Sequence, residues 1–213
     1  MEVTELAPGL WCWTGYHEEW KQDVGCVYLE TADAIVLIDP LIPSEDEARF
    51  LAALDRDVKR ERKPVHLVIT IFWHARSAGA LAGRYGARLW APGGGRAAVQ
   101  RRTEAVTDVF RPGDVLPGGI LAYASGRSTE HVLWIPSHRA LVPGDSILGA
   151  DDGGVRLCPE SWLPASVRHP KMRKALQPLL ELPIERILVS HGEPVLEGGR
   201  AALARALQAP SAA

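Results

Sequence analysis

The chain has 213 residues, of which 46% are hydrophobic and 23% charged, and its formal net charge at pH 7 is −2. This length and balance predict a soluble globular protein with one sizeable core. A slightly acidic chain lacks the basic excess that is typical of nucleic-acid binding or of binding to anionic membranes, so neither partner is expected.

The N-terminal segment and the cysteines indicate the compartment. Residues 1–5 have neither the basic start nor the apolar run of a signal peptide, and no apolar stretch in the chain reaches the length of a membrane span. The three cysteines have no C-x-x-C spacing; they are Cys12, Cys26 and Cys158. We therefore expect buried free thiols in a reducing, cytoplasmic location.

In the first half of the chain, apolar runs between turn-forming residues predict strands. These runs are residues 10–14, 24–30, 34–38, 65–70 and 88–91. Ser44 and Glu47 have the spacing of a capping box, which predicts a helix that ends near Arg56. A second helix is expected from about Ser77 to Tyr85, with Gly86 as the left-handed residue that ends it.

In the second half, further strands are predicted at residues 120–124, 132–135, 140–142 and 187–189. Residues 151–162 contain several glycines and prolines and predict a long loop. Helices are expected from about Ser166 to Leu180, with Pro170 in the first turn, and over residues 198–207. The absence of an interior linker rich in proline or serine predicts a single domain over residues 1–207, followed by a flexible tail at 208–213.

Five segments occur in an order that carries a family resemblance. They are the strand that ends at Asp39-Pro40, the stretch Val68–Gly79 around Thr70, the stretch Gly126–His131, and the two segments that end in Gly144-Asp145 and His191-Gly192. Together they resemble the metallo-β-lactamase superfamily over about residues 9–207. The resemblance implies a four-layer αββα sandwich, in which two mixed β-sheets are flanked by helices, and a zinc-dependent hydrolase site at one edge.

The ligand positions that the resemblance implies are mostly changed. The positions of the H-x-H-x-D-H motif hold Ile71, Trp73, Ala75 and Arg76, and the first His of G-H-T-x-x-H is replaced by Arg127. Asp145 and His191 are the two ligand residues that remain. Two ligands cannot form the three- or four-ligand array that zinc normally requires, so no metal or other cofactor is expected.

His74 and the two arginines complete the candidate site. His74 occupies a spacer position, so we expect it to point to the rim or to bond to backbone; a one-residue slip of the loop would instead turn it inward as a third ligand. We expect one or both guanidinium groups of Arg76 and Arg127 to occupy the metal space and bond Asp145, because a buried carboxylate without a partner is costly. A spare guanidinium would suit a small anionic molecule. Trp73 would fill volume.

Three functional interpretations follow. The first is a catalytically silent pseudoenzyme without metal, with a residual cleft for a small, anionic ligand made by Trp73, His74, Arg76, Arg127, Asp145 and His191. The second is a hydrolase of ester, thioester or lactam bonds with a rearranged mononuclear site, holding zinc or another divalent metal on Asp145, His191 and His74. The third is a scaffold or oligomerisation protein, and homo-oligomer formation stays open. The first interpretation is preferred.

Overall fold

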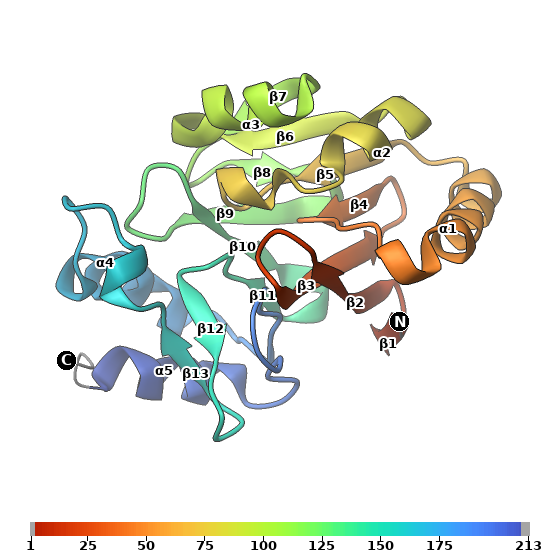
Figure 1. The fold of residues 1–213 in the computed structure, drawn as a ribbon. Coiled ribbons are helices and arrows are strands. Elements are labelled where there is room, and N and C mark those ends of the chain that lie inside the picture. The colour runs from red at the N-terminus through yellow and green to blue at the C-terminus, as the bar shows by residue number, and fades with distance from the viewer. Residues whose placement is uncertain (1–2, 210–213) are drawn as a thin grey trace.

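The computed structural model describes residues 3–209, which form two β-sheets packed face to face with helices on both outer surfaces (Figure 1). Helices α1, α2 and α3 cover the N-terminal sheet, and α4 and α5 cover the C-terminal sheet. This is the four-layer αββα arrangement that the sequence predicted.

The N-terminal sheet has seven strands that are neighbours in chain order. They are β1 Val3–Ala7, β2 Leu10–His17, β3 Gln22–Glu30, β4 Ile35–Ile38, β5 Val65–Val68, β6 Arg88–Pro92 and β7 Val106–Phe110. The first four strands pair antiparallel, whereas β4 to β7 pair parallel. The parallel pairs need crossover connections, and these contain α1 Glu47–Glu61, α2 Ala78–Tyr85 and α3 Arg96–Thr103.

The C-terminal sheet has the strand order β14-β11-β10-β9-β8. Its strands are β8 Val115–Leu116, β9 Ile120–Ala124, β10 His131–Ile135, β11 Ala140–Val142 and β14 Arg186–Ile187. A separate hairpin is formed by β12 Ile147–Gly149 and β13 Val155–Leu157. The remaining helices are α4 His169–Leu176 and α5 Gly199–Gln208. Short 3-10 turns lie at Ser44–Asp46, Phe72–Ala75, Gly93–Gly95, Pro117–Gly119, Pro136–His138, Glu160–Trp162 and Gln177–Glu181.

The core is divided among three apolar interfaces. Between the sheets, Ile38 of β4 packs in the same cluster as Leu133 of β10. Phe50 of α1 joins the cluster on the outer face of the first sheet, and Leu203 of α5 joins the one on the outer face of the second. Each fully buried side chain of this kind stabilises the fold by about 1.5–3 kcal/mol, so the packing on both faces of each sheet stabilises the sandwich.

Some predicted elements have different boundaries in the structure. No side chain caps α1, which follows the turn Ser44–Asp46 and continues to Glu61, so both the capping box and the end near Arg56 were wrong. Residues 151–162 contain strand β13 as well as loop. Helix α3 was missed because Val99 is its one buried side chain and gives no apolar periodicity.

Other boundary predictions are confirmed. Gly86 ends α2 with φ 58°, and its N–H donates to the carbonyl of Ala82. Pro170 lies in the first turn of α4. The predicted tail at 208–213 is not confirmed, because Gln208 is the last residue of α5 and residues 210–213 lie outside the described part of the chain.

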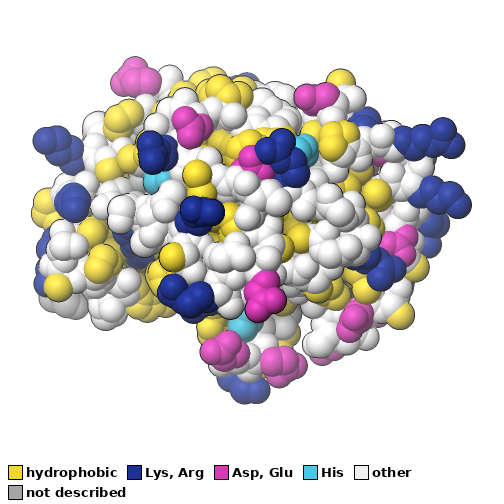
Figure 2. All heavy atoms as spheres, turned by 90° about the horizontal axis from the view of Figure 1, so that it is seen from above, with side chains coloured by type: hydrophobic (Ala, Val, Ile, Leu, Met, Phe, Trp, Pro, Cys, Tyr) yellow, Lys and Arg dark blue, Asp and Glu magenta, His cyan; other side chains and the backbone are white. Residues whose placement is uncertain are grey.

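The described residues include no helix with the length and apolar character needed to cross a bilayer. Figure 2 shows the upper face of the molecule, where Lys and Arg side chains are interspersed with Asp and Glu. This face has mixed charge without one continuous basic surface.

Candidate metal centre

Three loops at one edge of the sandwich bring the predicted site residues together. The 3-10 turn Phe72–Ala75 follows β5 and carries Trp73 and His74. Asp145 lies just after β11, and His191 lies after β14. Strands β11 and β14 pair in parallel, so the loops that follow these two strands leave the sheet at the same end.

The Nε2 atom of His74, the Nε2 atom of His191 and a carboxylate oxygen of Asp145 form one cluster. These three atoms lie within 4.8 Å of one another. Asp145 Oδ1 is 3.0 Å from His74 Nε2 and 3.3 Å from His191 Nε2. His74 is 0% exposed and Asp145 2% exposed, and His191 is partly buried. The prediction that His74 points to the rim or bonds to backbone was therefore wrong.

His74 turns inward because Asp39 holds its other ring nitrogen. The Nδ1 atom of His74 lies 2.8 Å from Asp39 Oδ2. Asp39 is fixed in turn by Thr70, whose backbone N–H donates to Oδ1 at 2.8 Å and whose hydroxyl donates to Oδ2 at 2.5 Å. Asp39 has a left-handed φ of 50°, a strained conformation for a residue with a side chain.

Trp73 has a polar role in addition to its bulk. Its indole Nε1–H donates to Asp145 Oδ2 at 2.6 Å. One oxygen of Asp145 therefore faces the indole and the other faces the two imidazoles. This bond fixes the orientation of the carboxylate. Trp73 therefore does more than fill volume, which was the role predicted from the sequence.

The two arginines flank the cluster without bonding Asp145, contrary to the sequence prediction. Arg76 donates to the carbonyl oxygens of Gly25 at 3.1 Å and Asp39 at 2.9 Å, and its guanidinium lies 5.8 Å from the ring centre of Trp20. The backbone of Arg76 has a positive φ of 33°, and its side chain bonds these carbonyl oxygens and not Asp145. Within residues 3–209, Asp145 forms no ion pair with an arginine, because the two histidines and Trp73 surround it.

Arg127 instead pairs with a buried acid that the sequence analysis missed. Its Nη1 lies 3.3 Å from Glu130 Oε2, and its Nη2 donates to the sulfur of Cys158 at 2.9 Å. Glu130 is 0% exposed and accepts a bond from the backbone N–H of Asp145 at 2.7 Å. Burial raises the pKa of Glu130 to about 7, although the Arg127 charge acts in the opposite direction.

The charges within the cluster support one another. Burial and the Arg76 charge lower the pKa of His74, but Asp145 and Asp39 outweigh both effects and raise it. Burial raises the pKa of Asp145, but His74 and His191 outweigh it and hold that pKa well below its usual range. This direction favours the anionic form of Asp145 at neutral pH.

A cavity of about 380 Å³ opens beside the cluster. Its lining comprises Trp20, Gln22, Phe72, Trp73, Arg102, Asp145, Trp162 and His191. A neighbouring hollow of about 560 Å³ shares Phe72, Trp73 and Trp162 with it. Trp162 and Arg102 were not predicted, because their segments carry no motif that places them near the site.

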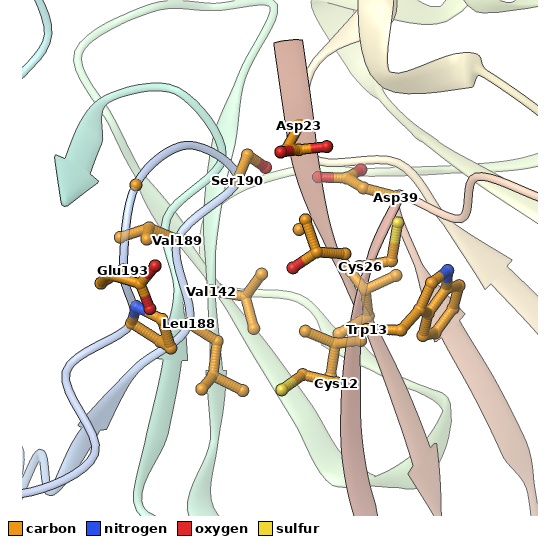
Figure 3. Close-up of a pocket in the computed structure, with 16 residues that line it drawn as sticks. Cys12, Trp13, Asp23, Cys26, Asp39, Val142, Leu188, Val189, Ser190 and Glu193 are labelled. Atoms are coloured by element: carbon orange, nitrogen blue, oxygen red, sulfur yellow. The ribbon is translucent and has the colours of Figure 1, made fainter. Parts of the chain in front are cut away.

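A third cavity, of about 270 Å³, lies between the sheets and is separate from this cleft (Figure 3). Cys12 and Cys26 line one side, and Val142 and Leu188 line the other. Burial raises the pKa of Cys26 to about 11, so this thiol stays protonated and is a poor nucleophile. None of the three clustered side chains lines this cavity.

The clustered residues fit a single divalent metal. His74 Nε2 and Asp145 Oδ1 are both buried, and neither has a hydrogen-bond partner although they lie close together. Two imidazoles and one carboxylate are a donor set that zinc accepts, and catalytic zinc sites commonly have three protein ligands. Asp39 on His74 and Trp73 on Asp145 are the kind of supporting bonds that orient metal ligands.

The whole fold is similar to solved metallo-β-lactamases. The enzyme from Pontibacter korlensis gives a TM-score of 0.72 at 18% identity, covering 98% of this chain and 99% of that one. FIM-1 from Pseudomonas aeruginosa, in its mono-zinc form, gives 0.71 at 15% identity, covering 97% and 94%. The enzyme from Hirschia baltica gives 0.66 at 17% identity, covering 97% and 95%. No protein-family pattern and no curated protein matches the chain.

This chain therefore has the metallo-β-lactamase fold, as its motifs predicted. At these identities the similarity establishes the fold alone. The cluster of His74, Asp145 and His191 is a feature of this chain's own geometry.

Proposed function

We propose that this protein is a mononuclear metal-dependent hydrolase that acts on an ester, thioester or lactam bond. The observation that carries the proposal is the convergence of three ligand atoms, from His74, Asp145 and His191, beside an open cleft. This is the second of the three interpretations of the sequence, in which the loop turns His74 inward. The mono-zinc form of FIM-1 supports the proposal by showing that this fold accommodates a single zinc.

The side chains of this chain have separate tasks in that reaction. Asp39 accepts the Nδ1 proton of His74, which leaves Nε2 free to bind the metal. Trp73 holds one oxygen of Asp145, so that the other oxygen faces the two histidines. His74, Asp145 and His191 would hold the divalent metal, which would supply Lewis acidity for the attack of water. Trp20 and Trp162 border the cleft and offer apolar walls to a bound substrate.

Acid–base catalysis by His191 without metal is a weaker explanation of the site. The Nε2 atom of His191 faces Asp145 at 3.3 Å, and its Nδ1 atom is buried without a hydrogen-bond partner. Neither ring nitrogen is therefore free to exchange a proton with a ligand in the cleft. A general base must reach the proton that it removes.

The metal-free, catalytically silent interpretation remains as a second candidate. It is favoured by the raised pKa of His74 and the lowered pKa of Asp145, because a protonated imidazole beside a carboxylate needs no metal. In that case the cleft would bind a small molecule without converting it. The two candidates differ in whether the cluster binds metal.

A zinc titration of chelator-treated full-length protein by calorimetry separates them. We expect one zinc per chain, lost in His74→Ala and in His191→Ala. His138→Ala is the matched control, since His138 lies in the turn that precedes β11, at the opposite end of that strand from Asp145, and contacts the carbonyl of Pro8. Hydrolysis of a panel of ester, thioester and lactam substrates should require that zinc. Absence of stoichiometric binding to the unmodified chain would refute the proposal.

A further inference from the structure

The cleft beside the cluster has walls made mainly of aromatic side chains. Trp20, Phe72, Trp73 and Trp162 all line the cavity of about 380 Å³. Phe72 and Trp73 are in edge-to-face contact at 4.6 Å between ring centres, and the Trp162 ring lies 5.9 Å from that of His191. Aromatic surfaces of this kind favour flat apolar groups, because rings stack at such separations.

Trp162 is a large hydrophobic side chain that is exposed to solvent. Its exposed fraction is 40%, and it lies in the turn Glu160–Trp162. It borders both the cavity beside the cluster and the neighbouring hollow of about 560 Å³. An exposed indole at the boundary of two hollows is a surface that a ligand can cover.

One cation lines the aromatic cavity and forms no ion pair with an acidic residue in the described part of the chain. Among the described residues around the cavity of about 380 Å³, Arg102 is the single lysine or arginine. Its guanidinium lies 5.1 Å from the ring centre of Phe72 and donates a hydrogen bond to the carbonyl of Ala98 at 3.3 Å. By contrast, two other surface arginines are paired: Arg84 forms an ion pair with Asp55, and Arg139 forms one with Glu185.

Helix α3, which carries Arg102, packs against the 3-10 turn that carries Phe72. The backbone there is close, since a Cβ added to Gly95 would lie 3.5 Å from the Cβ of Phe72. Figure 1 shows α3 at the same edge of the sandwich as this turn. A guanidinium stacked on a ring keeps its edge donors available for a carboxylate.

We infer that the cleft takes a substrate that carries both a flat aromatic group and a carboxylate, with the ring against Trp73 and Trp162 and the carboxylate on Arg102. Two other cations, Arg127 and Lys171, line the neighbouring hollow instead, and Arg127 is already paired with Glu130. The cavity volumes of about 380 and 560 Å³ lie in the range of small-molecule sites. Conversion of this molecule as a substrate rests on the proposed hydrolase function, whereas its binding to the cleft needs no metal.

The test measures binding of a naphthalene carboxylate and of the matching neutral carboxamide to the full-length chain by calorimetry. Both probes are titrated into chelator-treated and zinc-loaded protein. We expect the carboxylate to bind the chelator-treated protein more tightly than the carboxamide by about tenfold, the scale of one charge-assisted hydrogen bond. Arg102→Gln should remove that difference and leave carboxamide binding unchanged.

Two further variants complete the design. Trp162→Ala should weaken both probes, because it removes the ring contact and leaves the charge. Arg101→Gln is the matched control, since Arg101 is the neighbouring exposed arginine of α3 and lines neither hollow. It should bind both probes like the unmodified chain.

The inference is overturned if neither probe binds, if both bind equally, or if Arg101→Gln has the same effect as Arg102→Gln. Failure of zinc binding with the expected probe results would remove the proposed function and leave this inference standing. If the protein binds zinc but has equal affinity for both probes, this inference is wrong and the proposed hydrolase function still stands.

Discussion

The Nδ1 atom of His74 lies 2.8 Å from a carboxylate oxygen of Asp39, and this contact determines which way the imidazole points. Asp39 directly follows β4, and His74 lies in the turn after β5. The contact therefore joins the loops that follow two neighbouring parallel strands. It leaves Nε2 of His74 directed at Asp145, which is the basis of the proposed metal centre.

Asp39→Asn should weaken zinc binding by about 10- to 100-fold, the effect expected when a supporting bond to a ligand histidine is altered. The amide keeps the size of the carboxylate but not its charge, so His74 is less firmly held as the Nδ1-protonated tautomer. Calorimetric zinc titration measures the change. Asp33→Asn is the control, because Asp33 bonds Thr31 at the surface. Unchanged affinity in Asp39→Asn would show that this bond does not orient the ligand.

Trp73→Phe should lower the free energy of unfolding by about 1.5–3 kcal/mol, because the buried Asp145 loses the indole donor to Oδ2. Urea denaturation of the metal-free protein provides the measurement. Trp162→Phe serves for comparison, since that indole is 40% exposed and should change stability little. Equal effects of the two substitutions would contradict the role assigned to the Trp73 bond.

Glu130 should make stability depend on pH. Its pKa is raised from 4.5 to about 7 by burial, so the folded chain retains a proton that the unfolded chain releases between these values. The stabilisation from the neutral acid is complete below pH 4.5 and is lost as pH rises through about 7. Relative to Glu130→Gln, the free energy of unfolding should fall by up to about 3 kcal/mol over this range. A difference that stays constant or grows would rule this out.

Zinc affinity should increase with pH. The pKa of His74 is raised by Asp145 and Asp39 against the effects of burial and Arg76, and a metal ligand must be unprotonated. Proton competition therefore weakens binding below and just above the ordinary histidine pKa of 6.5. Titrations at about pH 6 and about pH 8 compare the two regimes. Affinity that is the same at both would indicate that His74 is not a ligand.

The sequence predicted the fold more completely than the site, for physical reasons that particular residues illustrate. Asp39, Thr70 and Asp145 stand where buried strands end, and such positions depend on apolar runs that can be read along the chain. The inward turn of His74 depends on Asp39, which is 35 residues away in sequence. No local pattern encodes such a contact.

The partner of Arg127 illustrates the same limit. Glu130 is only three residues away, yet an exposed and a buried glutamate look alike in a sequence. Because Glu130 takes up the guanidinium, the expected bond from an arginine to Asp145 does not form. Trp162 and Arg102 reach the cleft through a loop and a helix whose sequences have no periodic apolar signal.

Anomalous diffraction from crystals of the zinc-treated full-length protein tests the central claim most directly. The account predicts one zinc peak per chain, bonded to Nε2 of His74, Oδ1 of Asp145 and Nε2 of His191. A map without a peak at these atoms, with His74 and Asp145 still in direct contact, would contradict it.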